Sequence, residues 1–163
     1  FAGKTVVDLG AGSMLRAKFF EAADIIVIEP LAARILENIE WTDISDAKEV
    51  HSTPAEERVE TLVGQADFLF SMNVLDHCFN FEGIVQNIRD YLKPDGVAFL
   101  SFDKHDVSDD MHPLHLNEDI CRDIFEKSGF VVDKMSTGTN GILPKDTYGH
   151  GPYCINSWLS LSK

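Results

Sequence analysis

The sequence predicts an α/β protein, a three-layer Rossmann-like sandwich on a mostly parallel sheet. Two observations predict it. Short apolar runs alternate along the chain with segments in which apolar residues recur at helical spacing, the order expected of βαβ units. The 163 residues are 44% hydrophobic and 25% charged, the balance of one ordinary globular domain over 1–163. Because the chain opens directly on an apolar run, we expect an N-terminal cap segment of the domain to be missing.

Seven short segments, most of them apolar, predict strands at 5–9, 24–29, 49–52, 66–71, 97–102, 130–135 and 155–161. The run at 66–71 is almost continuously apolar, so we expect it to be buried on both faces. Helical periodicity predicts helices at 13–23, 31–39, 81–92 and 117–128. Asn117 can cap the last helix and Gly129 can end it. We expect a turn at 94–96 and a long loop, rich in glycine and proline, at 136–153.

Composition disfavours several kinds of partner. The net charge of −13 repels phosphate backbones, so we expect no nucleic-acid partner. No apolar run approaches the roughly 20 residues of a membrane span, so we expect no membrane partner. Three widely spaced cysteines argue against a zinc site or a disulfide framework and favour a cytoplasmic location: Cys78, Cys121 and Cys154. The oligomeric state stays open.

A glycine-rich loop and an acidic residue are placed to hold an adenosine-containing cofactor. Gly10 and Gly12 follow the first strand, where glycines let the backbone approach a ligand closely. Glu29 ends the second strand at the same edge of the sheet and can accept hydrogen bonds from ribose hydroxyls. A plain turn and a solvated strand end are the alternatives. Leu15 replaces the third glycine of the dinucleotide fingerprint, and no Walker lysine follows.

Six segments, in order and at the right spacing, resemble the class I S-adenosylmethionine (SAM)-dependent methyltransferases, particularly small-molecule enzymes of the ubiquinone-methyltransferase type. The resemblance covers nearly the whole chain. Its segments are the glycine loop at 7–12, the acidic strand end at 27–30, the adenine loop at 53–57, the fourth strand and following turn at 66–77, the turn at 92–96 and the last helix with its strand entry at 115–130.

The resemblance implies a seven-stranded sheet with a C-terminal antiparallel pair, and methyl transfer from SAM to a small-molecule acceptor by in-line displacement. It also implies a set of cofactor-binding residues. Two positions depart from the family pattern: Met14 stands where a third glycine is frequent, and Pro54 where an acidic residue is frequent. The implied cofactor residues are Asp8, Gly10, Ala11, Gly12, Glu29, Pro30, Ala55, Glu56, Ser71, Met72 and Asn73.

Three histidines are candidates for a general base: His77, His112 and His115. A neutral imidazole can take the proton of a hydroxyl acceptor, although each histidine could instead cap a helix or bind a buried backbone group. The spacing of His112 and His115 also suits metal binding. Without a third ligand in the sequence we expect no metal site.

Four aspartates, Asp103, Asp106, Asp109 and Asp110, form a solvated loop or a site for a cationic amine or divalent ion. Two other functions compete with methyl transfer. Met14 and Pro54 leave room for a catalytically silent, methyltransferase-like binding or assembly module. A NAD(P)-dependent oxidoreductase is disfavoured by the missing third glycine.

Overall fold

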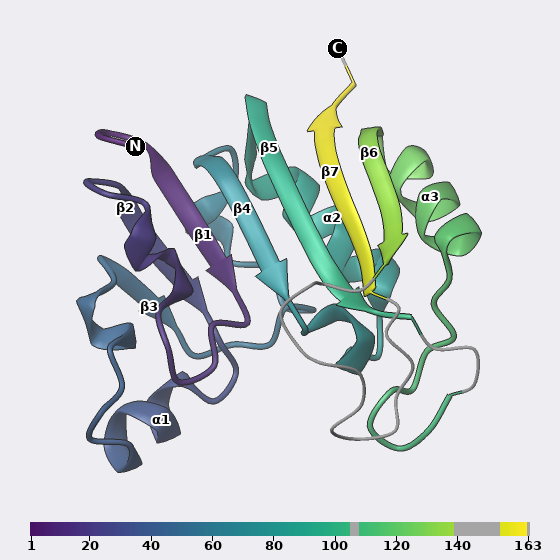
Figure 1. Ribbon diagram of the computed structural model, residues 1–163. Helices are drawn as coiled ribbons and strands as arrows, with labels where there is room; N and C mark the ends of the chain where they lie inside the picture. Colours follow the sequence, from purple (N-terminus) through teal and green to yellow (C-terminus); the bar gives the residue numbers. More distant parts are fainter. Residues whose placement is uncertain (105–107, 139–153, 163) are drawn as a thin grey trace.

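The computed structural model describes residues 1–104, 108–138 and 154–162. Its centre is a seven-stranded sheet in the order β3-β2-β1-β4-β5-β7-β6 (Figure 1). The first five strands of that order are parallel, and β7 pairs antiparallel with both β5 and β6. The strands are β1 (Thr5–Leu9), β2 (Asp24–Ile28), β3 (Glu49–His51), β4 (Ala66–Met72), β5 (Leu92–Asp103), β6 (Phe130–Gly138) and β7 (Cys154–Leu161). The predicted fold class, with its C-terminal antiparallel pair, is confirmed.

Three α-helices and four short 3₁₀ turns connect the strands. Each of the two longer helices begins after an asparagine whose side chain caps its first turn. Asn80 Oδ1 accepts from the Gly83 N–H (3.0 Å), and Asn117 Oδ1 accepts from the Ile120 N–H (2.9 Å). The cap at Asn117 was predicted. The helices and turns are α1 (Ala32–Asn38), α2 (Phe81–Tyr91), α3 (Glu118–Lys127), η1 (Arg16–Phe19), η2 (Ile44–Asp46), η3 (Glu60–Leu62) and η4 (Leu75–His77).

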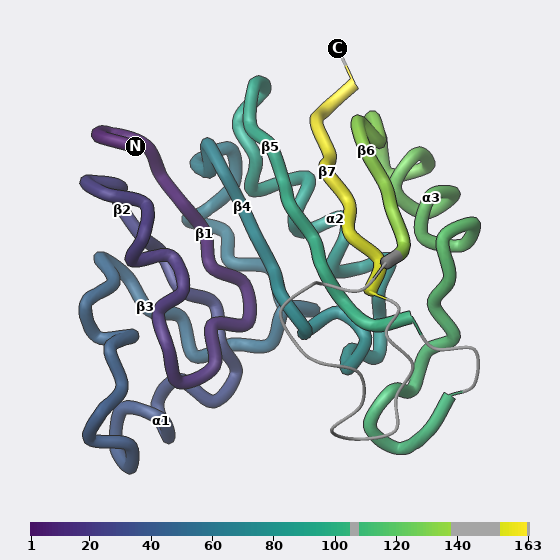
Figure 2. Tube along the Cα trace, viewed as in Figure 1, coloured from purple at the N-terminus to yellow at the C-terminus, as the bar shows by residue number. Residues whose placement is uncertain are grey.

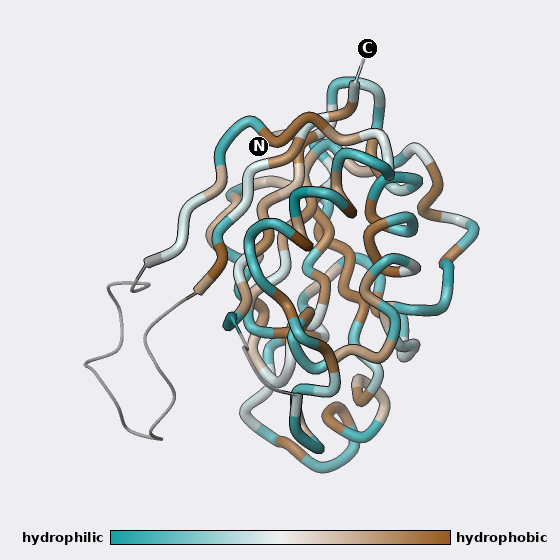
Figure 3. The backbone as a smooth tube through the Cα atoms, turned by 90° about the vertical axis from the view of Figure 1, so that its right-hand side faces the viewer, coloured by the Kyte–Doolittle hydropathy of each residue, from teal (hydrophilic) through white to brown (hydrophobic). Residues whose placement is uncertain are grey.

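Hydrophobic side chains pack against the sheet in two clusters, one on each face. The larger joins the apolar faces of α2 and α3 to β4, β5 and β7, for example Ile88 and Phe125 with Leu100. The smaller joins η1 and α1 to the opposite face of β1 and β2, around Val6 and Val27. Figure 3 shows hydrophobic residues along the strands and hydrophilic ones along the outer turns. None of the described helices has the length and apolar character to span a membrane.

The helix expected at 13–23 is wrong, because only η1 forms there. Hydrogen bonds of the i→i+3 type, Phe20 N–H to Ala17 O and Ala23 N–H to Phe20 O, replace an α-helical ladder. Ala22 then adopts φ +59°, in the left-handed region that ends a helix. The Leu15 N–H is drawn toward Asp43 Oδ1 (2.6 Å), which ties the segment to the η2 region.

The turn expected at 94–96 lies inside β5. Ala66 pairs with Leu92 and Phe68 with Val97, so the intervening residues of β5 bulge out of the ladder. A Cβ at Gly96 would lie 2.8 Å from the Ala66 carbonyl oxygen, a close approach that only glycine permits. β6 is longer than the predicted strand and reaches Gly138. Most of the loop expected at 136–153 lies outside the described residues.

Candidate functional site

The carboxyl ends of the parallel strands meet at one edge of the sheet (Figure 2). At this edge the Gly10 N–H donates to the Ile28 carbonyl (2.7 Å), and the Glu29 N–H donates to that of His51 (3.0 Å). The strand ends thereby form one continuous rim. Beside it lies a cavity of about 500 Å³ with a mainly apolar lining, formed by Gly10, Ile28, Pro30, Pro54, Ala55, Glu56, Glu57, Val74, His77, Cys78, Phe79 and Ile84.

The glycine loop and Glu29 are in direct contact. One oxygen of the buried Glu29 carboxylate accepts from the Gly12 N–H (3.0 Å) and the other from the Leu31 N–H (3.0 Å). Gly10 and Gly12 adopt φ +78° and +63°, the left-handed region that glycine occupies without strain. The bend after β1 and the acidic residue after β2 therefore share one rim, as the sequence predicted.

The two glycines differ in what surrounds them. A Cβ at Gly10 would lie 2.2 Å from Cγ2 of Val74, so Val74 uses the space that the missing side chain leaves. A Cβ at Gly12 would meet no atom of the described residues within 4 Å. The backbone is therefore open to a ligand at Gly12 and closely packed at Gly10.

A buried amide holds the opposite wall of the cavity, and the sequence analysis missed it. Asn87 lies on the buried face of α2, and its Nδ2 donates to the carbonyls of Ala55 (2.9 Å) and Glu56 (3.1 Å). Glu56 Oε1 accepts in turn from the Phe79 N–H (3.1 Å). A polar residue within the apolar stripe of a helix was the available signal.

Of the predicted cofactor residues, four line the cavity: Gly10, Pro30, Ala55 and Glu56. Gly12 and Glu29 lie at the rim beside it, and the remaining ones do not line it either. Ser71 and Ala11 are buried, and Met72 ends β4. Asn73 is exposed at φ +59°, and its N–H donates to the Ser101 carbonyl (2.7 Å).

Asp8 is buried beneath the loop, and its Oδ2 accepts from the Ala17 N–H (3.2 Å). Burial raises its pKa to about 6, although this hydrogen bond and the nearby Arg16 oppose the rise. Asp8 therefore anchors η1 to β1 from inside the fold.

Two of the three predicted histidines come together, and the third stays apart. The rings of His77 and His112 have centroids 4.7 Å apart, and both approach Asp76, whose side chain is fully buried. His77 also lines the cavity, whereas His115 is exposed. Asp76 was not predicted. A single aspartate between Leu75 and His77 gives no distinctive sequence pattern of burial.

The aspartates after β5 do not form one cluster. Asp103 Oδ1 accepts from Cys154 Sγ (3.0 Å), Asp110 is exposed, and Asp106 lies outside the described residues. Asp109 binds His112, which lowers the pKa of its carboxyl group to about 2.

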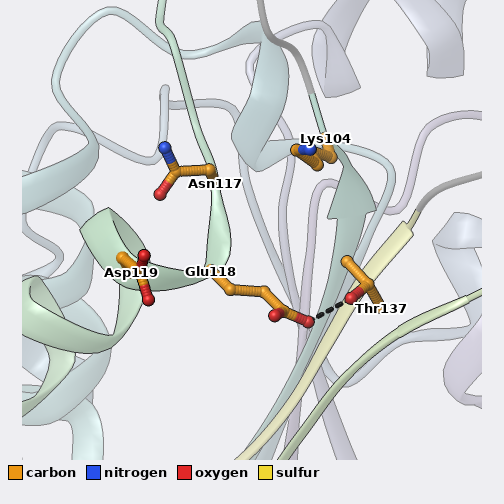
Figure 4. Close-up of a pocket in the computed structure, with 5 residues that line it drawn as sticks. All are labelled: Lys104, Asn117, Glu118, Asp119 and Thr137. Carbon is orange, nitrogen blue, oxygen red and sulfur yellow. Dashed lines mark hydrogen bonds between the residues drawn. The ribbon is translucent and has the colours of Figure 1, made fainter.

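A second hollow lies at the start of α3 (Figure 4). Three of its polar side chains already have partners: Asn117 caps α3, and Glu118 accepts from Thr137. Its sparse apolar lining suits a purine ring less well than the larger cavity does.

A family model described as a methyltransferase domain matches residues 1–123. This chain belongs to that family. No curated protein matches the sequence of this methyltransferase domain. Solved structures share its fold at low sequence identity, and 829 chains match it.

Three of these structures illustrate the likeness. A Listeria monocytogenes protein named as an S-adenosylmethionine-dependent methyltransferase has a TM-score of 0.75 and 14% identity, over 99% of this chain and 91% of that one. Phosphoethanolamine N-methyltransferase 2 of Haemonchus contortus, in complex with SAM, has a TM-score of 0.71 and 14% identity, over 99% and 49%. 1,6-Didemethyltoxoflavin-N1-methyltransferase of Burkholderia thailandensis, with substrate and S-adenosylhomocysteine, has a TM-score of 0.66 and 15% identity, over 99% and 72%.

Replacing Asp8 by Asn tests the buried carboxyl group. Because the folded-state pKa is raised, the folded protein binds more protons than the unfolded chain between about pH 4 and 6. As the pH rises from about 4 to 6, the free energy of unfolding of the wild type should therefore fall by about 3 kcal/mol relative to that of Asp8→Asn. The amide of the variant does not titrate and can keep the bond to Ala17. Urea unfolding from pH 4 to 7 measures the difference, and parallel profiles would refute the assignment.

Alanine at Gly10 and at Gly12 separates backbone strain from packing. Both changes force a side chain into the left-handed region, but only Gly10→Ala also collides with Val74. We expect Gly10→Ala to lower the free energy of unfolding by about 1–3 kcal/mol more than Gly12→Ala. Val74→Ala removes the group that collides with the new Cβ. Gly10→Ala should therefore lower the free energy of unfolding less in a Val74→Ala background than in the wild type. Equal losses at the two glycines in urea unfolding would contradict the packing.

Proposed function

We propose that this methyltransferase domain binds SAM in the cavity beside Gly10 and Glu29 and transfers its methyl group to a small-molecule acceptor. One observation carries the proposal: the Glu29 carboxylate accepts from the Gly12 N–H at the edge of an apolar cavity of nucleoside size. The glycine loop and the acidic strand end can then contact the two sides of one nucleoside.

The cavity has features that suit an adenosine group. Pro30 and Ala55 line it with Ile28, which gives the flat apolar surroundings that a purine ring needs. Its volume of about 500 Å³ lies within the range of small-ligand sites. Pro54 supplies neither a carboxylate nor an N–H, so recognition of the adenine depends on its neighbours and on apolar contact.

Glu29 is placed to bind the ribose. Each carboxylate oxygen has two acceptor positions, and the Gly12 and Leu31 N–H groups use one on each oxygen. The remaining positions can accept from the two ribose hydroxyls. The methionine end would then pass the open side of Gly12 toward Ser71 and Asn73.

SAM brings a methyl group already activated by its sulfonium. The protein's part is to align the acceptor with that carbon and to exclude water. His77 lines the cavity, and its Nδ1 lies 2.9 Å from the Met111 carbonyl, which fixes the ring. In this tautomer Nε2 is the acceptor and can take a proton from a hydroxyl or protonated amine.

A small molecule is the class of acceptor that the fold relatives and the net charge favour. The phosphoethanolamine and didemethyltoxoflavin enzymes named above share this fold and, by their names, methylate small molecules. The net charge of −13 disfavours nucleic acid as the acceptor. The same charge suits a neutral or cationic molecule.

Replacing Glu29 by Ala should weaken S-adenosylhomocysteine binding about 10- to 100-fold, because hydrogen bonds from the ribose hydroxyls to a charged acceptor are lost. Glu29→Gln, which keeps one acceptor oxygen, should fall between. Glu37→Ala, at an exposed position on α1, is the matched control and should bind as the wild type does. Isothermal titration calorimetry measures the affinities, and circular dichroism checks that each variant folds.

Equal affinity of wild type and Glu29→Ala would reject the proposed ribose contact. Stabilisation by NADH but not by S-adenosylhomocysteine in thermal unfolding would favour an oxidoreductase instead. Cofactor binding without turnover on hydroxyl, amine and carbon acceptors would favour the silent binding module.

A further inference from the structure

A buried carboxylate and two imidazole nitrogens converge beside the cofactor cavity. Asp76 Oδ2 lies 3.6 Å from His77 Nε2 and 3.8 Å from His112 Nε2. One ligand atom from each residue fits within a set whose members all lie within 4.8 Å of one another. The Asp76 side chain is 1% exposed, that of His112 11% and that of His77 36%, so the cluster opens on the His77 side.

Both imidazoles are held by their other ring nitrogen. His77 Nδ1 lies 2.9 Å from the Met111 carbonyl oxygen, and His112 Nδ1 lies 3.0 Å from Asp109 Oδ1. A carbonyl and a carboxylate can only accept, so in the neutral form of each ring Nδ1 carries the proton and Nε2 presents a lone pair. Metal-binding histidines are oriented in this way, by a carbonyl or carboxylate on the ring nitrogen that does not bind the metal.

The distances favour a shared ion over direct hydrogen bonds. Charge-assisted N–H···O bonds have N···O distances of about 2.7–2.9 Å, well below 3.6 and 3.8 Å. Ligands bound tetrahedrally at about 2.0–2.1 Å lie about 3.4 Å apart. The two carboxylate–imidazole distances, 3.6 and 3.8 Å, lie close to that separation, and the ligand atoms of the three residues all lie within 4.8 Å of one another.

We propose that Asp76, His77 and His112 bind one divalent transition-metal ion. Two imidazoles and one carboxylate are a donor set that zinc, cobalt, iron(II) and manganese accept, and three protein ligands leave a position open. Cys78 lines the cavity but is not part of the cluster, and its Sγ donates to the Leu75 carbonyl (2.8 Å). Binding of the ion goes beyond the proposed function and does not depend on it. An ion on His77 Nε2 takes the lone pair that would otherwise accept a proton, so in the metal-bound protein His77 would orient the acceptor through the ion instead of acting as its base.

The position of the metal site also narrows the chemical class of the methyl acceptor, and this inference rests on the proposed function. His77 belongs both to the metal cluster and to the lining of the cavity. An ion on His77 would present its open position to a molecule held there. The acceptor would then carry an oxygen or nitrogen donor next to the methylated atom, as a catechol or a hydroxy acid does.

Metal binding is tested on the whole chain after chelator treatment, by titration with Co²⁺ followed in the visible spectrum and with Zn²⁺ in a calorimeter. We expect one ion per chain, the ligand-field bands of a low-coordinate cobalt site, and a Tm that rises with Zn²⁺ concentration. His77→Ala and His112→Ala should each weaken binding at least 10-fold. His115→Ala, three residues from His112 but exposed, is the matched control and should bind as the wild type does.

Asp76→Asn replaces a buried carboxylate by an amide of the same shape and should also weaken Co²⁺ binding. If this variant does not fold, the spectra of the two histidine variants still decide the matter. Absence of cobalt bands in the wild type, or equal binding by His112→Ala and His115→Ala, would overturn the site. S-adenosylhomocysteine titrated into the same metal-free protein separates the two proposals, because its binding without any metal binding would leave the proposed function standing.

Discussion

The Glu29 carboxylate joins the ends of two strands, and the rest of the site depends on that contact. It accepts from the Gly12 N–H after β1 and the Leu31 N–H after β2, so one side chain fixes the loop that follows each strand. Both contacts are part-buried, where an unpaired N–H group is costly. The contact that orders the rim therefore also holds in place the charged acceptor that we propose for the ribose.

A second polar group fixes the opposite wall in the same way. Asn87 reaches from α2 to two carbonyls of the 54–57 loop, a segment without regular structure of its own. The apolar wall at Ala55 is thus held by a helix that is itself anchored in the larger core cluster. The cavity is defined by two polar contacts on a rigid framework, which is how a largely apolar site keeps its shape without a bound ligand.

The sequence predicted the fold well because most strands of the parallel sheet contain a short, largely apolar run, with β3 the exception. It failed at 13–23, where Leu15, Phe19 and Ala22 recur at helical spacing but the chain turns too tightly for an α-helix. That outcome depends on Asp43 and Ala22, through a distant hydrogen bond and a positive φ that periodicity does not encode. Local pattern decides an element only where tertiary contacts agree with it.

The same contrast between local pattern and tertiary contacts distinguishes the glycine loop and Glu29 from the cluster of Asp76 and the histidines. Gly10, Gly12 and Glu29 follow their strands directly, so strand order alone places them on one rim. The convergence of Asp76 with His112 joins η4 to a segment beyond β5, 36 positions later in the chain. Spacing suggested His112 with His115 instead, and the exposed position of His115 shows why such a pair misleads. Two residues at close spacing share a site only if the backbone turns both inward.

The turn after β4 links the cofactor end of the cavity to the histidine cluster. Within five residues it packs Val74 against Gly10, buries Asp76 and directs His77 into the cavity. Asn73, at φ +59° and bonded to the Ser101 carbonyl of β5, sets the direction in which this turn leaves the sheet. One short turn therefore carries both the side chain that packs against the glycine loop and the imidazole that lines the cavity.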